Sequence, residues 1–115
     1  MYTPVYSADA PTPEDVASST GPLVLEFGTN WCPICTGAQG AIRQALEDLP
    51  DVPHIKVEDG PGRKLGRSFR VKLWPTLIFL RDGQEVARAV RPGGVEEIRN
   101  ALQAATGGAP GRVSG

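Results

Sequence analysis

Two cysteines separated by two residues are the groups in this chain best suited to covalent chemistry. Cys32 and Cys35 are the only cysteines among the 115 residues. They follow an apolar run at 23–25 and precede a segment with helical periodicity, which places them where a strand passes into a helix. A helix N-terminus offers free N–H groups and a dipole that favour a thiolate at Cys32. The pattern predicts a thiol–disulfide redox site, in which Cys32 attacks and the more buried Cys35 resolves the mixed disulfide.

The same cysteines make a poor set of metal ligands. A structural zinc site takes four Cys or His ligands, whereas this chain has two cysteines and one histidine, His54, on a different predicted strand. Covalent haem attachment needs a histidine directly after the second cysteine, and Thr36 occupies that position. We therefore expect no metal and no other cofactor.

A carboxylate lies in the middle of the apolar strand that precedes the cysteines. Because an unpaired buried charge is costly, Glu26 either points to solvent or a salt partner, or is buried for a functional reason. In the second case desolvation would raise the pKa of Glu26, and its carboxylate would accept the proton of Cys35 during resolution. The residues alone leave both interpretations open.

Length and composition predict one domain without a strong charge. The chain is long enough for a modest core, and its formal net charge of −1 gives no field that attracts nucleic acid or a membrane surface. No apolar run reaches the roughly 18 residues of a membrane span, and the first residues lack the basic and apolar regions of a secretory signal. We therefore expect a cytoplasmic monomer that binds neither nucleic acid nor membrane.

Strands and helices are predicted to alternate between residues 11 and 106, which form the single domain. Helices are expected over 12–20, 33–49, 63–69 and 95–105, and strands over 23–27, 53–58, 77–80 and 85–90. Gly40 predicts a kink in the second helix or a close approach to the sheet. Residues 1–10 and 107–115 lack periodicity and are predicted to be a flexible arm and a flexible tail.

This order of elements predicts an α/β fold with a central mixed β-sheet flanked by helices on both faces. We expect the strands at 23–27, 53–58 and 77–80 to run parallel through crossover helices. The strand at 85–90 follows a tight Asp82-Gly83 turn and is expected to form an antiparallel edge.

The stretch Trp31-Cys32-Pro33-Ile34-Cys35, with Trp74-Pro75-Thr76 about forty residues later, resembles the thioredoxin family. The resemblance runs from about residue 23 to 102. It implies the thioredoxin fold and a protein-disulfide oxidoreductase that acts on protein disulfides and is recycled by an enzyme such as a thioredoxin reductase. It also implies a cis-proline that faces the disulfide, at Pro75. The residues expected to contact a substrate are Trp31, Pro33, Ile34, Trp74, Pro75 and Thr76. For Trp74, packing in the core is an equally open alternative.

The resemblance also bears on the charged residues and shows departures. Glu26 stands where thioredoxins usually carry Asp, which implies a proton acceptor for Cys35, and Lys56 matches a lysine that neighbours this acid. Gly28 stands where relatives usually have an aromatic or other large residue. Ile34 keeps a backbone N–H where thioredoxins commonly have proline, so we expect that N–H to point at Cys32 beside the N–H of Cys35.

The predicted function is that of a cytosolic reductase of protein disulfides. One alternative is a disulfide oxidase or isomerase-like protein, which would have a less negative reduction potential. The other is a non-catalytic binding module or chaperone that uses the groove around Trp74 and Pro75, and whose partner binding would not depend on Cys32.

Overall fold

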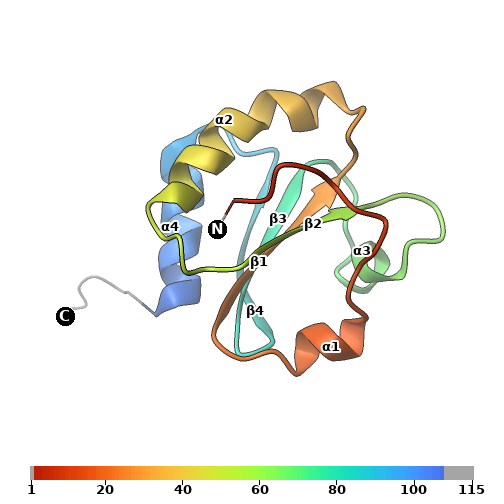
Figure 1. Cartoon of the computed structure of the whole chain (residues 1–115), viewed down its shortest axis with the longest axis horizontal. Coiled ribbons are helices and arrows are strands. Elements are labelled where there is room, and N and C mark those ends of the chain that lie inside the picture. The colour runs from red at the N-terminus through yellow and green to blue at the C-terminus, as the bar shows by residue number, and fades with distance from the viewer. Residues whose placement is uncertain (1, 108–115) are drawn as a thin grey trace.

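The computed structural model describes residues 2–107, which form a four-stranded sheet with helices on both faces (Figure 1). The elements in chain order are α1 Pro13–Ala17, β1 Pro22–Gly28, α2 Pro33–Glu47, β2 His54–Glu58, α3 Lys64–Ser68, β3 Thr76–Arg81, β4 Gln84–Val90 and α4 Val95–Thr106. The tail predicted for 107–115 lies, apart from Gly107, outside the described residues. Within 2–107 no helix has the length and apolar character needed to cross a membrane.

The sheet is mixed, with the strand order β2-β1-β3-β4. Strand β1 runs parallel to β2, whereas β3 is antiparallel to both β1 and β4. The expectation that the strand at 77–80 runs parallel to the first two was therefore wrong. Helix α3 has five residues and spans only about 7.5 Å, too short to carry the chain along the whole sheet. The chain instead turns back and enters β3 beside the end of β1, where Thr76 pairs with Phe27.

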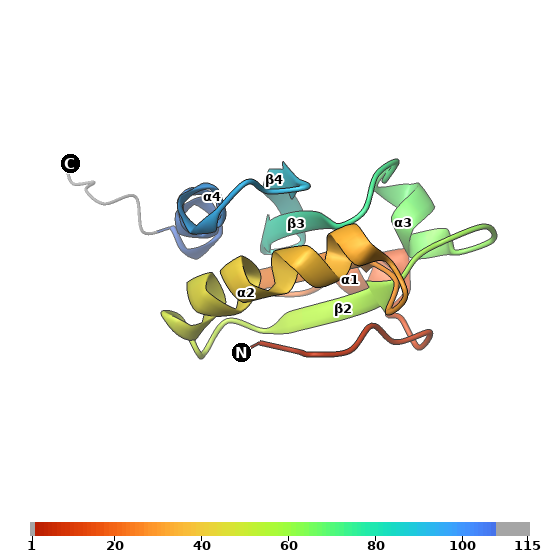
Figure 2. The ribbon, with the colours of Figure 1, turned by 90° about the horizontal axis from the view of Figure 1, so that it is seen from above.

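The two faces of the sheet carry separate apolar clusters. Helices α2 and α4 cover one face, and α1 and α3 cover the other (Figures 1 and 2). Alternate residues of β1 divide between them: Leu25 and Phe27 pack toward α1 and α3, and Val24 packs toward α2 and α4. Glu26, two residues after Val24, therefore points toward α2.

The N-terminal segment runs along β2, at the outer edge of the sheet (Figure 2). Ser7 forms a parallel bridge with Val57; its N–H donates to the carbonyl of Lys56 (3.0 Å) and its carbonyl accepts the N–H of Glu58 (2.8 Å). Tyr6 is only 5% exposed. These contacts differ from the loosely held arm expected from the sequence, because an edge strand leaves backbone groups free for another segment to pair with.

Helix α2 carries both cysteines at its first turn and packs on the sheet through its second half. Ile42, Ala45 and Leu46 are fully buried against the sheet and α4. Gly40 is exposed, and a Cβ added to it would meet nothing within 4 Å. The expected close approach of Gly40 to the sheet is therefore absent from this helix.

Candidate active site

The two sulfurs lie at the N-terminus of α2, as the sequence predicted. Cys32 is the N-cap residue, and its Sγ accepts the backbone N–H of Cys35 at 3.2 Å. Among the described residues this is the only backbone N–H that donates to Cys32 Sγ; Ile34 contributes none, contrary to expectation. Ile34 is the second helical residue, and an N-cap side chain bonds the N–H of either the second or the third.

The two thiols have different surroundings. Cys35 is fully buried, whereas Cys32 is 7% exposed at the surface end of the site. Burial, and then the neighbouring Cys32 sulfur, raises the pKa of the Cys35 thiol to about 11, while a hydrogen bond from the backbone of Thr29 opposes the rise. Cys35 therefore remains a thiol near neutral pH until a base takes its proton.

Two tryptophans form an apolar rim next to Cys32. Trp31 is 73% exposed, and its ring meets that of Trp74 edge-to-face, with centroids 6.0 Å apart. The indole N–H of Trp74 donates to Asp59 at 2.8 Å, which fixes the half-buried ring against the cysteines. Ile34, 46% exposed, adds a further apolar side chain. The name "tryptophan rim" is used below for Trp31, Ile34 and Trp74.

The loop before β3 contains the predicted cis-proline. The Trp74–Pro75 peptide bond is cis. The Nε–H of Arg91 donates to the carbonyl of Trp74 at 2.9 Å, and the backbone N–H of Arg91 donates to the carbonyl of Pro75 at 2.9 Å. Thr76, one of the expected contact residues, is buried, and its hydroxyl donates to the carbonyl of Leu73. Its side chain thus holds the loop and does not face outward.

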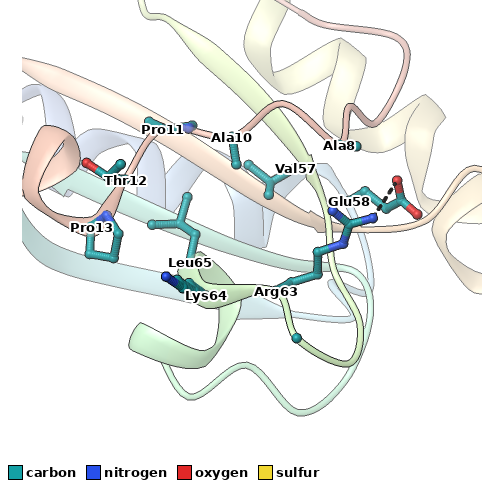
Figure 3. Close-up of a pocket in the computed structure, with 11 residues that line it drawn as sticks. Ala8, Ala10, Pro11, Thr12, Pro13, Val57, Glu58, Arg63, Lys64 and Leu65 are labelled. Carbon is teal, nitrogen blue, oxygen red and sulfur yellow. Dashed lines mark ion pairs between the residues drawn. The ribbon is translucent and has the colours of Figure 1, made fainter.

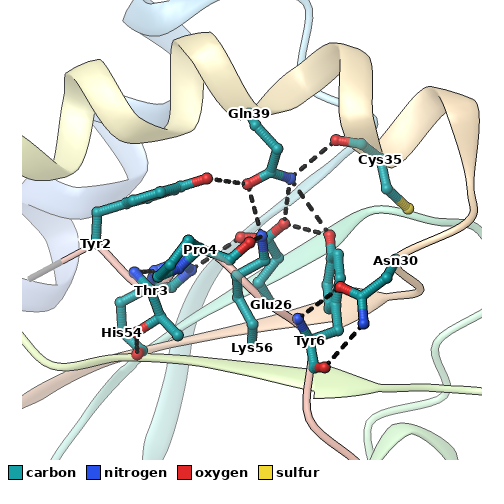
Figure 4. Close-up of polar contacts among 10 residues, drawn as sticks. All are labelled: Tyr2, Thr3, Pro4, Tyr6, Glu26, Asn30, Cys35, Gln39, His54 and Lys56. Carbon is teal, nitrogen blue, oxygen red and sulfur yellow. Dashed lines mark hydrogen bonds and ion pairs between the residues drawn. The ribbon is translucent and has the colours of Figure 1, made fainter.

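Glu26 is fully buried beneath α2 and accepts three hydrogen bonds (Figure 4). Its Oε2 accepts from the Tyr6 hydroxyl and from Nε2 of Gln39 (2.8 Å), and its Oε1 lies 2.8 Å from Nε2 of His54. Burial alone would raise the pKa of Glu26, but the hydrogen bonds from His54, Tyr6 and Gln39 outweigh it and hold that pKa below its usual value. The expected rise was therefore wrong, because donors from three parts of the chain converge on this carboxylate.

The hydrogen bonds of His54 define which of its nitrogens carries the proton. Its Nδ1 accepts the backbone N–H of Thr3 at 2.8 Å, so Nδ1 is unprotonated. Nε2 must then donate to Glu26, and the imidazole is neutral. His54 therefore stabilises the carboxylate of Glu26 through the hydrogen bond from Nε2.

Gln39, on α2, joins this network to the cysteines. Its Nε2 donates to Glu26 and, at 2.8 Å, to the carbonyl of Cys35. Its Oε1 accepts from the hydroxyl of Tyr2 (2.7 Å) and from Nζ of Lys56 (2.8 Å). Lys56 pairs with Glu26 in the strand register but reaches it only through Gln39. Burial lowers the pKa of Lys56, although the negative charge of Glu26 acts in the opposite direction and raises it.

Sequence reasoning missed three members of this site, namely Tyr6, Gln39 and His54. The pairing of His54 was readable in principle: once Glu26 is aligned with Lys56, His54 lies on the same face of the neighbouring strand. Gln39 lies four residues after Cys35 on the same helix, where side chains share a face. No local pattern indicates Tyr6.

A hollow of about 250 Å³ opens between the N-terminal segment and α3, away from the cysteines (Figure 3). Its walls include the apolar side chains of Val57 and Leu65, and its one ion pair joins Arg63 to Glu58 at 3.5 Å. Neither cysteine lines this hollow.

Comparison with known proteins gives one family. The family model described as Thioredoxin matches residues 5–104. The solved structure of thioredoxin 2 from Pseudomonas aeruginosa PAO1, in its reduced form, is 51% identical, with a TM-score of 0.82 over 92% of this chain and 98% of that one. A thioredoxin of Mycobacterium tuberculosis is 34% identical over 71% of this chain and 72% of its own length. Thioredoxin Asp f 28 of Aspergillus fumigatus is 25% identical over 86% and 92%.

Proposed function

Because this chain belongs to the thioredoxin family of protein-disulfide oxidoreductases, we propose that it reduces protein disulfides through a mixed disulfide on Cys32. The observation that carries the proposal is the contrast between the two sulfurs. Cys32 Sγ lies at the helix N-terminus and accepts a backbone N–H, which stabilises a thiolate there. Cys35 is buried one turn further and keeps its proton.

The reaction takes two exchanges of sulfur. In the first, the Cys32 thiolate attacks one sulfur of the partner's disulfide, forms the Cys32–partner disulfide and releases the other sulfur as a thiolate. In the second, Cys35 loses its proton and attacks Cys32 Sγ, which forms the Cys32–Cys35 disulfide and releases the second partner sulfur. Two electrons pass from the cysteine pair to the partner. Glu26 is the proposed acceptor of the Cys35 proton.

The tryptophan rim is the proposed docking surface for the partner. Exposed aromatic surface beside a reactive sulfur is suited to an extended peptide segment, and the backbone around the cis Trp74–Pro75 bond offers polar groups to it. Arg91 already occupies one position on the Trp74 carbonyl, so we expect an incoming backbone N–H to share that oxygen or to displace the arginine.

The proposed direction is reduction in the cytosol, with recycling by a separate reductase such as a thioredoxin reductase. The similarity to proteins named thioredoxin supports this direction. A reduction potential near the −270 mV of thioredoxin, measured against glutathione or dithiothreitol, agrees with it. A potential near −120 mV would indicate a disulfide oxidase instead.

The experiment that tests the division of labour compares two single variants. Cys35→Ser leaves the attacking sulfur but removes the resolving one, so it accumulates disulfide-linked partners. Cys32→Ser, the matched control, retains a buried thiol and accumulates none. Nonreducing electrophoresis with mass spectrometry measures both. Faster alkylation of Cys35 than of Cys32 in the reduced protein would reverse the assignment, and partner binding that survives Cys32→Ser without turnover would indicate a binding module.

A further inference from the structure

The hydroxyl of Tyr6 lies between the resolving thiol and the buried carboxylate. On one side Tyr6 donates a hydrogen bond to Oε2 of Glu26. On the other side Tyr6 packs in one cluster with Cys35. A Cβ built on Gly28 would be 2.7 Å from Sγ of Cys35 and 2.7 Å from the Tyr6 oxygen, so both atoms border the same small space. Figure 4 shows the phenol oxygen between Glu26 and the sulfur of Cys35. The missing side chain of Gly28 is what allows oxygen and sulfur to share this space.

The backbone of Tyr6 is held by the loop that leads into the cysteines. Its N–H donates to Oδ1 of Asn30 at 2.9 Å, and its carbonyl accepts Nδ2 of the same residue at 3.1 Å. Ser7 then pairs with β2. Asn30 comes two residues before Cys32, so these two hydrogen bonds connect the N-terminal segment to the loop that leads into the cysteines. Tyr6 is therefore positioned by the site itself and not only by the edge of the sheet.

We propose that Tyr6 is a catalytic residue that passes the proton of Cys35 to Glu26 during resolution of the mixed disulfide. The Cys35 Sγ–H bond breaks and its proton goes to the oxygen of Tyr6, while the phenol proton moves to Oε2 of Glu26. Tyr6 ends as it began, Glu26 is protonated, and the Cys35 thiolate attacks Cys32 Sγ. The partner's sulfur leaves as a thiolate, and the proton on Glu26 is finally released to water. No further oxidant or reductant is needed.

The surroundings of Tyr6 favour passage of the Cys35 proton through a neutral phenol over ionisation of that phenol. Burial and the charge of Glu26 raise the pKa of Tyr6, so the phenol keeps a proton in the resting site. The other titratable groups beside it are Cys32 at the start of α2 and Lys56 on β2, whose Nζ lies 4.3 Å from the ring centroid. The proton path from Cys35 therefore ends at the ionised carboxylate of Glu26.

The proposal rests on the two-step function given above, and one experiment separates the two. Reduced protein is mixed with 5,5′-dithiobis(2-nitrobenzoate) in stopped flow, and the release of thionitrobenzoate is followed. The first equivalent reports attack by Cys32 and scales with reagent concentration, whereas the second reports resolution by Cys35 and does not. The Cys35→Ser variant must release only one equivalent of thionitrobenzoate. A second equivalent from that variant would refute the two-step function, whatever the role of Tyr6.

Tyr6→Phe keeps the ring and removes only the hydroxyl. We expect its first phase to match the parent and its second phase to slow by about 10²-fold at neutral pH, the low end of what a positioned proton-transfer group contributes. Ser68→Ala is the control, because it removes a hydroxyl that donates to the carbonyl of Leu65 in α3 and lies outside the hydrogen bonds of Cys35, Glu26 and Gln39. Its second phase is expected to equal that of the parent.

The pH profile distinguishes proton transfer from a structural role. In the parent, the second phase is expected to be nearly flat between pH 6 and 9, because Glu26 is ionised and Cys35 protonated throughout. In Tyr6→Phe it should rise about tenfold per pH unit, because resolution then depends on free Cys35 thiolate. A variant whose second phase is slow but equally flat would show that Tyr6 only positions the helix. A variant as fast as the parent would overturn the proposal outright.

Discussion

Glu26 and His54 form a fully buried pair, with Oε1 and Nε2 2.8 Å apart, in which the imidazole is neutral and donates its proton to an ionised carboxylate. The pair joins two neighbouring parallel strands on the face that lies beneath α2. Thr3, in the N-terminal segment, determines the protonated nitrogen of His54 through its backbone N–H. The charge on Glu26 therefore depends on contacts with a part of the chain that carries no secondary-structure signal.

The first prediction is that Glu26→Gln destabilises the reduced protein near neutral pH. The folded state lowers the pKa of Glu26, so the contribution of its ionised form is present above the unfolded value of about 4.3 and is lost as pH falls through the folded pKa. Exchanging the charged acceptor for a neutral one should cost about 1–3 kcal/mol at pH 7. The difference from the parent should shrink below about pH 4.

Urea denaturation of both proteins between pH 3 and 8 measures this difference. Glu47→Gln is the control, because Glu47 is exposed and its ion pair within residues 2–107 is with Arg43 on the same helix, so its loss should matter little. A Glu26→Gln variant more stable than the parent at pH 7 would mean that the carboxylate lacks adequate donors. The sequence by itself suggested that outcome, since it showed Glu26 only among apolar neighbours.

The second prediction concerns two glycines with opposite surroundings. A Cβ on Gly28 would meet Cys35 Sγ and the Tyr6 oxygen at 2.7 Å, so Gly28→Ala must displace Tyr6 or the start of α2. Such overpacking should cost about 1–3 kcal/mol. Gly40→Ala adds a methyl group to an exposed helix position with nothing within 4 Å, and should stabilise by roughly 0.5–1 kcal/mol.

Urea denaturation of the two glycine variants under the same conditions shows whether each variant is less or more stable than the parent. Equal stabilities for Gly28→Ala and the parent would show that Tyr6 withdraws from the site without cost. In that event the second phase of thionitrobenzoate release in Gly28→Ala should slow as it does in Tyr6→Phe, because the hydroxyl no longer lies beside Cys35. A Gly40→Ala variant less stable than the parent would mean that the added methyl group collides with a neighbouring atom, contrary to the open surroundings of Gly40.

Local sequence signals were sufficient for the elements that carry the cysteines. Thr12 forms the predicted cap with Asp15, and Asp82-Gly83 forms the predicted turn with both residues at positive φ. The Cys-x-x-Cys pair lies at the predicted strand-to-helix junction. Each of these features is determined by residues close together in the sequence. Sequence patterns and the family resemblance could therefore predict them.

The surroundings of Glu26 and the path of β3 could not be read in the same way. The direction of β3 depends on how far a short helix carries the chain, and the helical pattern at 63–69 did not show that distance. Tyr6 reaches the cysteines only because Gly28 leaves space and Asn30 holds the backbone of Tyr6. Contacts of this kind join residues more than twenty positions apart and leave no periodic trace.

The third prediction concerns Trp74 and separates docking from chemistry. Its ring is held against the cysteines by Asp59 and meets Trp31 edge-to-face, which makes it the best-anchored part of the tryptophan rim. Trp74→Ala should raise the KM for reduction of insulin by roughly 5–30-fold, as expected for about 1–2 kcal/mol of lost contact, with little change in kcat. Reaction with 5,5′-dithiobis(2-nitrobenzoate), which is too small to need the rim, should be unaffected.

Val86→Ala is the matched control for Trp74→Ala, because Val86 is an exposed apolar residue on β4 that contributes nothing to the rim. Its KM for insulin should remain that of the parent. Steady-state turnover with both substrates, at several insulin concentrations, gives KM and kcat separately. If Trp74→Ala lowered kcat for both substrates alike and left the KM for insulin unchanged, the indole would act on the sulfurs and not on the partner. The docking surface would then have to be sought away from Trp74.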